Sequence, residues 1–218
     1  MISGTFKRAL LMLTLLPTTA PLAAAQLEAA DAQTLIAQLA KPAPATIDFS
    51  EIRFSPLLKQ PLIVSGTLGY QGPTALDRQV TRPYRETTEI RGDSVRVRRE
   101  GEPERSFGLK RAPELQGLLS AFTSLLAGDH AAVERDFAID AAGGGAAWRI
   151  LLAPRDARLS RRVKLIRIEG RNDAPRCFSI IGDNDGASVM LLGAATHAEL
   201  PQPVTREWLD RFCSQQHE

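Results

Sequence analysis

Most of the chain alternates apolar and polar residues with the period of two that is typical of half-buried β-strands. In the clearest example, Val95 and Val97 point to one face of a strand while Arg96 and Arg98 point to the other. Such stretches are separated by turns rich in glycine, asparagine and aspartate. They predict about eleven short strands, at residues 46–54, 62–70, 76–81, 84–91, 94–99, 106–109, 133–139, 147–153, 162–170, 175–182 and 187–194.

One long segment departs from the period of two. It begins at Pro113, which suits the first turn of a helix, and ends at Gly128, which suits a C-terminal cap. Between them, large apolar residues recur at helical spacing. They are Leu115, Leu118, Leu119, Phe122, Leu125 and Leu126. The pattern predicts a strongly amphipathic helix, and shorter helical segments are predicted at residues 28–40 and 204–212.

These elements together predict a mainly β (α+β) fold. We expect an unclosed antiparallel β-barrel, or curved sheet, that wraps around the amphipathic helix as a lid. A sheet this curved, with large apolar residues inside it, can leave a hydrophobic cavity. No internal repeat or long linker divides the chain, so residues 26–218 are expected to form a single domain.

The first residues have the pattern of a secretory signal peptide. Lys7 and Arg8 precede a largely apolar run at residues 9–16, and small residues follow up to Ala25. The run is too short to cross a hydrocarbon core, which needs about 20 residues. We therefore expect residues 1–25 to be a signal peptide that is cleaved after Ala25, and the mature protein to be periplasmic.

The charge balance argues against a nucleic-acid partner. The chain has 27 basic and 25 acidic residues, and loss of Lys7 and Arg8 with the signal peptide removes the basic excess. Contacts from lysine and arginine to phosphates supply most nucleic-acid affinity, so a neutral domain is a poor binder. In an oxidising compartment, Cys177 and Cys213 are candidates for one disulfide, although a position near the C-terminus could leave Cys213 free.

The sequence carries none of the common catalytic or cofactor motifs. It has no G-x-S-x-G elbow, no HExxH, no P-loop and no GxGxxG. None of His130, His197 and His217 has a catalytic partner at local spacing, and His130 is expected in a solvated loop. Asp183 and Asp185 fit a hairpin turn better than a calcium loop. We assign no catalytic residue, metal or cofactor, although a hydrolytic site assembled only in space stays open.

Positive charge is concentrated in the segment from Arg155 to Arg171. Seven basic residues stand there against Asp156 and Glu169. The segment could bind anionic phospholipid headgroups or an acidic partner. It could equally be the solvated face of a strand and its loop.

Several local motifs, taken in order, resemble the LolA family and in particular its LolA-related branch. The resemblance extends over nearly all of residues 30–195. The motifs are Phe49-x-Glu51-x-Arg53, Leu57-Leu58-x-x-Pro61-Leu62-x-x-x-Gly66-x-Leu68-x-Tyr70, Pro83-x-x-Glu86, Ile90-x-Gly92-Asp93, Leu125-Leu126-Ala127-Gly128-Asp129 and Trp148-x-x-x-Leu152-x-Pro154.

The resemblance implies a carrier with a helical lid over a hydrophobic cavity. Such a protein receives lipoproteins or other acylated cargo from an inner-membrane transporter and passes them to an outer-membrane acceptor. It hydrolyses no nucleotide itself, and we expect a monomer. A family arginine shortly after the second strand helps to hold the lid, and Arg78 stands at the matching place. The alternative function is a periplasmic lipid or acyl hydrolase, or an accessory protein of a lipid or glycolipid export system.

On this interpretation, cargo displaces the lid helix from the cavity. The lid would contribute Leu118, Leu119, Phe122 and Leu125. The cavity walls would contribute Leu68, Tyr70, Val95, Val97, Trp148 and Met190. An apolar lining and a detachable helix suit a carrier, because acyl chains must be hidden from water, at ~0.8 kcal/mol per methylene, and still be released.

Overall fold

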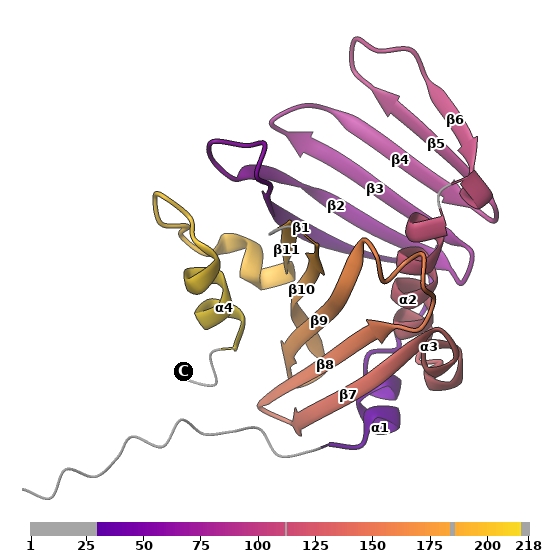
Figure 1. The fold of residues 1–218 in the computed structure, drawn as a ribbon, viewed down its shortest axis with the longest axis vertical. Coiled ribbons are helices and arrows are strands. Elements are labelled where there is room, and N and C mark those ends of the chain that lie inside the picture. The colour runs from indigo at the N-terminus through magenta and orange to yellow at the C-terminus, as the bar shows by residue number, and fades with distance from the viewer. Residues whose placement is uncertain (1–29, 112, 184–185, 215–218) are drawn as a thin grey trace, which may run out of the picture.

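The computed structural model describes residues 30–111, 113–183 and 186–214. In this part of the chain, eleven strands form one antiparallel sheet with the order β6-β5-β4-β3-β2-β1-β11-β10-β9-β8-β7 (Figure 1). Strands β6 and β7 are its two edges, so the sheet is unclosed and the expected fold class is confirmed. The strands are β1 (Ala45–Phe54), β2 (Leu62–Gly72), β3 (Ala75–Arg82), β4 (Glu86–Arg91), β5 (Ser94–Arg99), β6 (Arg105–Gly108), β7 (Phe137–Gly144), β8 (Ala147–Pro154), β9 (Val163–Arg171), β10 (Ala174–Gly182) and β11 (Ala187–Leu192).

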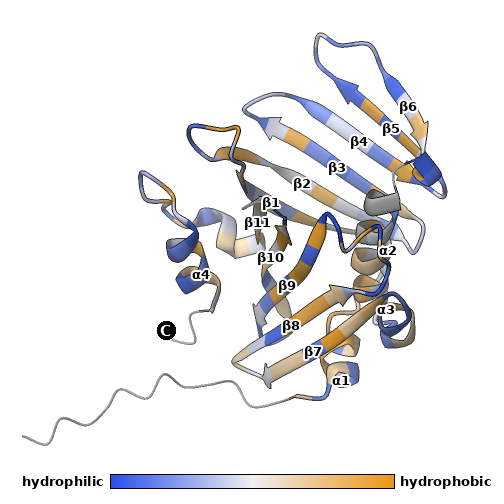
Figure 2. Ribbon diagram, in the orientation of Figure 1, coloured by the Kyte–Doolittle hydropathy of each residue, from blue (hydrophilic) through white to orange (hydrophobic). Residues whose placement is uncertain are grey.

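The sheet consists of two meanders that meet at its centre. Strands β1 to β6 pair with their neighbours in sequence, strands β7 to β11 do the same, and the pairing of β1 with β11 joins the halves. Figure 2 shows hydrophobic and hydrophilic positions alternating along β5 and β9. This alternation gives each meander an apolar inner face, because successive side chains of a strand point to opposite sides.

Within the described residues, four helices pack on the two faces of the sheet. They are α1 (Ala32–Gln38), α2 (Pro113–Ala127), α3 (His130–Asp136) and α4 (Arg206–Ser214), with short 3-10 turns η1 (Leu109–Arg111) and η2 (Gly193–His197). Helices α1, α2 and α3 share the main core with inward-facing side chains such as Phe49 and Ile150. Helix α4 packs on the outer face against Ile52 and Val189. Helix α2 is the predicted amphipathic helix, and it lies inside the curve of the sheet (Figure 1).

One predicted strand, at residues 133–139, is wrong. These residues instead end helix α3 and begin strand β7. Val133 and Phe137 are four positions apart, a spacing that places both on one face of a helix as well as of a strand. The side chain of Asp129 accepts a hydrogen bond from the backbone N–H of Ala132 at 3.0 Å and so starts the helix. His130, expected in a loop, is therefore the first residue of α3.

The two cysteines form a disulfide between the sheet and the C-terminal helix. Cys177 on β10 and Cys213 on α4 are joined by an S–S bond of 2.06 Å. Both are buried in the outer core with Leu209. The expected signal peptide, residues 1–25, and His217 lie outside the described residues. Within those residues, no helix combines the length and the apolar character needed to cross a membrane.

Candidate functional site

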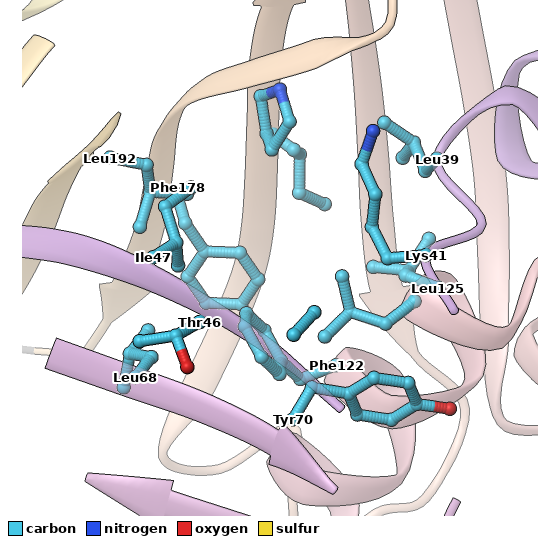
Figure 3. Close-up of a pocket in the computed structure, with 14 residues that line it drawn as sticks. Leu39, Lys41, Thr46, Ile47, Leu68, Tyr70, Phe122, Leu125, Phe178 and Leu192 are labelled. Carbon is cyan, nitrogen blue, oxygen red and sulfur yellow. The ribbon is translucent and has the colours of Figure 1, made fainter. Parts of the chain in front are cut away.

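An apolar cavity of about 160 Å³ lies between α2 and the inner face of the sheet (Figure 3). Its walls come from both halves of the sheet, from α2, and from the segment that follows α1. The lining residues are Leu39, Lys41, Ala45, Thr46, Ile47, Leu68, Tyr70, Phe122, Leu125, Leu126, Ile168, Pro175, Phe178 and Leu192.

Strand register explains why these side chains meet. Residues directly opposite one another in an antiparallel pair project from the same face of the sheet. Ile47 on β1 lies opposite Leu68 on β2. On the other half of the sheet, Phe178 on β10 lies opposite Ile168 on β9. Both apolar pairs belong to the lining of the cavity.

Helix α2 closes the cavity mainly through apolar contacts. Phe122 meets Phe178 edge-on, with ring centroids 5.6 Å apart and an interplanar angle of 81° (Figure 3). Polar bonds at the periphery of the helix include that from the backbone N–H of Lys41 to the carbonyl oxygen of Leu126, at 2.8 Å. A helix held mostly by apolar surface can leave the sheet without breaking a large polar network, because the apolar groups of a ligand can replace its contacts.

The mouth of the cavity carries one charged lining residue, Lys41. Its aliphatic stem contributes to the apolar wall, and its Nζ donates to the carbonyl oxygen of Asp173 at 3.2 Å. Nζ also lies 3.7 Å from Oδ2 of the same aspartate. Among the described residues that line the cavity there is no histidine, carboxylate or cysteine. The chemistry that this lining supports is the binding of apolar groups.

The cavity is smaller than the expected role as a carrier of acyl chains requires. A 150 Å³ apolar cavity takes a molecule about the size of benzene. Sites for larger organic ligands have volumes of roughly 300–1,000 Å³. At about 160 Å³, the site as closed by α2 is too small for a long acyl chain. Movement of α2 would be needed to enlarge it.

Four of the candidate cavity residues lie together in the lining. Leu68 and Tyr70 project from β2, and Phe122 and Leu125 project from α2. Leu118, another candidate on this helix, has a side chain that lies outside the described part of the structure.

The other candidates lie elsewhere in the interior. Val95 and Leu119 are buried in a separate cluster beneath β4 and β5, and Val97 packs at its margin. Trp148 is buried in the main core and donates its indole N–H to the carbonyl oxygen of Asn172 at 2.8 Å, and Met190 packs against that core.

Several lining residues were not among the candidates. They are Leu39, Lys41, Ala45, Thr46, Ile47, Leu126, Ile168, Pro175, Phe178 and Leu192. Phe178 and Leu192 belong to strands that are apolar at both parities, so alternation alone does not show which side chains face inward. Leu126 lies on the apolar stripe of the predicted helix, and that stripe was the signal that could have identified it.

Arg78 lies in a buried polar cluster next to the cavity wall. Its Nη2 donates to Oε2 of Glu51 at 2.7 Å, and its guanidinium lies 4.8 Å from the ring centroid of Phe49. Nη1 lies 3.7 Å from Oε1 of Glu86. These partners belong to strands β1 and β4. The family resemblance placed the arginine against the lid, whereas the contacts described here join it to the sheet.

Glu51 is the centre of this cluster and is only 6% exposed. Arg53 donates to both of its carboxylate oxygens at 2.8 Å, and Ser188 donates to Oε1 at 2.6 Å. Burial alone would raise the pKa of Glu51, but the hydrogen bonds and positive charges around it outweigh burial and lower the pKa below its ordinary value. The carboxylate therefore stays ionised inside the fold.

Comparison with known proteins identifies the family. A family model described as outer membrane lipoprotein carrier protein LolA-like matches residues 23–215. Among solved structures, a LolA superfamily protein from Nitrosomonas europaea aligns with a TM-score of 0.43 and 9% sequence identity. That alignment covers 83% of this chain and 100% of the other. No curated protein matches the sequence significantly.

Proposed function

The chain belongs to the LolA-like family of outer membrane lipoprotein carriers, and from this premise we propose that it is a periplasmic carrier of acylated cargo. Its cavity would shelter the acyl chains of a lipoprotein, or of another lipidated molecule, during transfer toward the outer membrane. The observation that carries the proposal is the apolar cavity between the sheet and a helix held mainly by apolar contacts.

The energetics of acyl chains fit this site. Each methylene withdrawn from water contributes ~0.8 kcal/mol, so a cavity needs no polar anchor to bind a long chain. When the acyl chain leaves, another apolar surface must shield the lining of the cavity from water, and α2 supplies it through Phe122 and Leu125. Loading and release then become a population shift between a closed state and an open state.

The remaining parts of the proposal concern the route of the cargo. Residues 1–25 would direct export and be cleaved after Ala25, leaving residues 26–218 as one carrier domain. The domain would act as a monomer and without a cofactor. It would accept cargo from an inner-membrane transporter and deliver it to an outer-membrane acceptor.

The proposal is tested by placing a charge on the cavity wall. Ile47 lines the cavity and is only partly buried, so Ile47→Asp should fold. A carboxylate there would face bound acyl chains with no hydrogen-bonding partner, which costs at least as much as an unpaired neutral polar group, about 1–3 kcal/mol. We expect the affinity for a lipidated peptide to fall about tenfold or more, as measured by fluorescence titration.

Ile63→Asp is the matched control. Ile63 lies on the neighbouring strand, is 38% exposed and projects from the outer face opposite Ile52. This variant makes the same chemical change away from the cavity and should bind the peptide like the wild type. Circular dichroism verifies that both variants fold. Equal affinity in folded Ile47→Asp and wild type would remove the cavity from the mechanism.

A further inference from the structure

The connection between β8 and β9, residues 155–162, presents a cluster of arginines to solvent. Arg155, Arg158, Arg161 and Arg162 are all exposed, and Asp156 is the one acidic residue among them. We propose that this arginine loop, residues 155–162, is a docking surface for anionic phospholipid headgroups. The proposal does not depend on which cargo occupies the cavity.

Arg155 of the loop donates from Nε to the carbonyl oxygen of Glu134 at 3.0 Å, whereas cations of the strand that follows the loop pair with carboxylates. On β9, Nζ of Lys164 lies 3.3 Å from Oδ2 of Asp183. Arg167 forms an ion pair with Asp210 of α4, and its Nε lies 3.3 Å from Oε2 of Glu169. These cations join elements of the fold to one another. The basic segment therefore divides into a structural strand and an arginine-rich loop.

The loop has a defined shape. Oδ1 of Asp156 accepts the backbone N–H groups of Arg158 at 2.9 Å and of Leu159 at 2.8 Å. The carbonyl oxygen of Asp156 accepts the N–H of Ser160 at 2.9 Å. The single carboxylate of the loop thus holds the turn together, and four arginines against one aspartate leave an excess of three positive charges. A preformed turn lowers the entropy lost when its side chains bind a surface.

The loop is also in direct contact with helix α2. Leu159 is 4% exposed and belongs to the main core. A Cβ atom on Gly117 of α2 would lie 2.6 Å from Cδ2 of Leu159, so the side chain of Leu159 packs directly against the helix where glycine leaves room for it. Figure 1 shows this connection beside α2. Docking through the arginine loop would therefore bring the helix that closes the cavity next to the membrane surface.

The chemistry of the loop fits phosphate better than it fits a protein surface. Guanidinium groups bind phosphate oxygens in pairs of parallel hydrogen bonds. Arginines at protein interfaces act together with aromatic anchors, tryptophan and tyrosine above all, near the centre of the interface. The one large apolar residue of the loop, Leu159, is already buried in the core, and Ala157 is small. An anionic bilayer needs no such anchor, and each arginine near it strengthens binding about fivefold.

The test measures binding of the mature chain to vesicles by flotation. One set of vesicles is phosphatidylcholine, and the other is an equimolar mixture of phosphatidylcholine and phosphatidylglycerol. We expect binding to the anionic vesicles, and a decrease of about 30-fold in the double variant Arg158→Gln/Arg161→Gln, from about fivefold per arginine. Because both vesicle types carry acyl chains, the difference between them isolates the headgroup charge from the cavity.

The control variant Arg96→Gln/Arg98→Gln removes the same charge from β5. Those arginines are exposed and form ion pairs with Glu89 and Glu104. This variant should keep its vesicle binding, and both double variants should keep their affinity for a lipidated peptide. Equal losses in the two double variants would overturn the proposal, since net charge alone would explain them. Failure of the wild type to prefer anionic vesicles would also overturn it and favour an acidic protein partner.

Discussion

Replacing Phe122 with alanine should make the protein bind acyl chains more tightly, although the substitution removes apolar surface. Phe122 is half-buried on α2, lines the cavity and packs edge-on against Phe178. In the closed state it therefore helps to hold the helix in the site that cargo would occupy. Removing its ring weakens the closed state more than the open one.

The size of the effect follows from these contacts. Full burial of a phenylalanine side chain stabilises by about 1.5–3 kcal/mol, and half-burial by about half of that. An edge-to-face aromatic pair adds about 0.5–1.5 kcal/mol. A loss of about 2 kcal/mol shifts the ratio of closed to open states about 30-fold. The apparent dissociation constant scales inversely with the open fraction, so the affinity of Phe122→Ala should rise by as much as about 30-fold.

The assay is a titration of the mature chain with a fluorescent lipidated peptide. Gln116→Ala is the control, because Gln116 lies on the exposed side of the same helix. Thermal unfolding should show a loss of stability in Phe122→Ala and little change in the control. If folded Phe122→Ala binds the peptide as the wild type does, or more weakly, then α2 does not gate the cavity and the reasoning is refuted.

Two further predictions concern the disulfide and the buried polar cluster around Glu51. Replacing both Cys177 and Cys213 with serine should lower the free energy of unfolding by roughly 3–4 kcal/mol, from the entropy of a loop with a sequence separation of 36. Denaturant titration measures this loss. The affinity for the lipidated peptide should stay unchanged because α4 packs on the outer face. A large loss of affinity would contradict the independence of the cavity from the disulfide. The depressed pKa of Glu51 means that its ionised form stabilises the fold above the ordinary value of 4.5, and that this contribution is lost as the pH falls through the lower folded pKa. Glu51→Gln should therefore lose about 2 kcal/mol of stability at pH 7. Below pH 4.5 it should lose less further stability than the wild type does. Equal pH dependence of the unfolding free energy in the two proteins would disprove the stabilising role of the ionised carboxylate.

The strands were predictable where one face of the sheet is polar. In β5, Val95 and Val97 alternate with arginines, and the observed strand matches the predicted range. The prediction failed at residues 133–139, where the spacing of Val133 and Phe137 fits a helix as well as a strand. The central pairing of β1 with β11 has no local signal, because it joins residues far apart in the chain.

The cavity residues were predictable only where an inward-facing side chain also lies on a strand or helix that borders the cavity. Leu68 and Tyr70 share the inner face of β2, and the apolar stripe of α2 identified Phe122 and Leu125. Val95 and Val97 also face inward, but they lie far along the sheet in a separate cluster. Alternation assigns a side chain to a face of the sheet and gives no information about which strands border the cavity.

We propose above all that the cavity under α2 carries an acylated molecule. Native mass spectrometry of the mature chain, purified from periplasm without detergent, tests it most directly. We expect a complex in which one chain carries one acylated species, and the added mass identifies the class of cargo. A bare chain that also takes up no added lipidated peptide would show that the cavity does not carry acylated molecules.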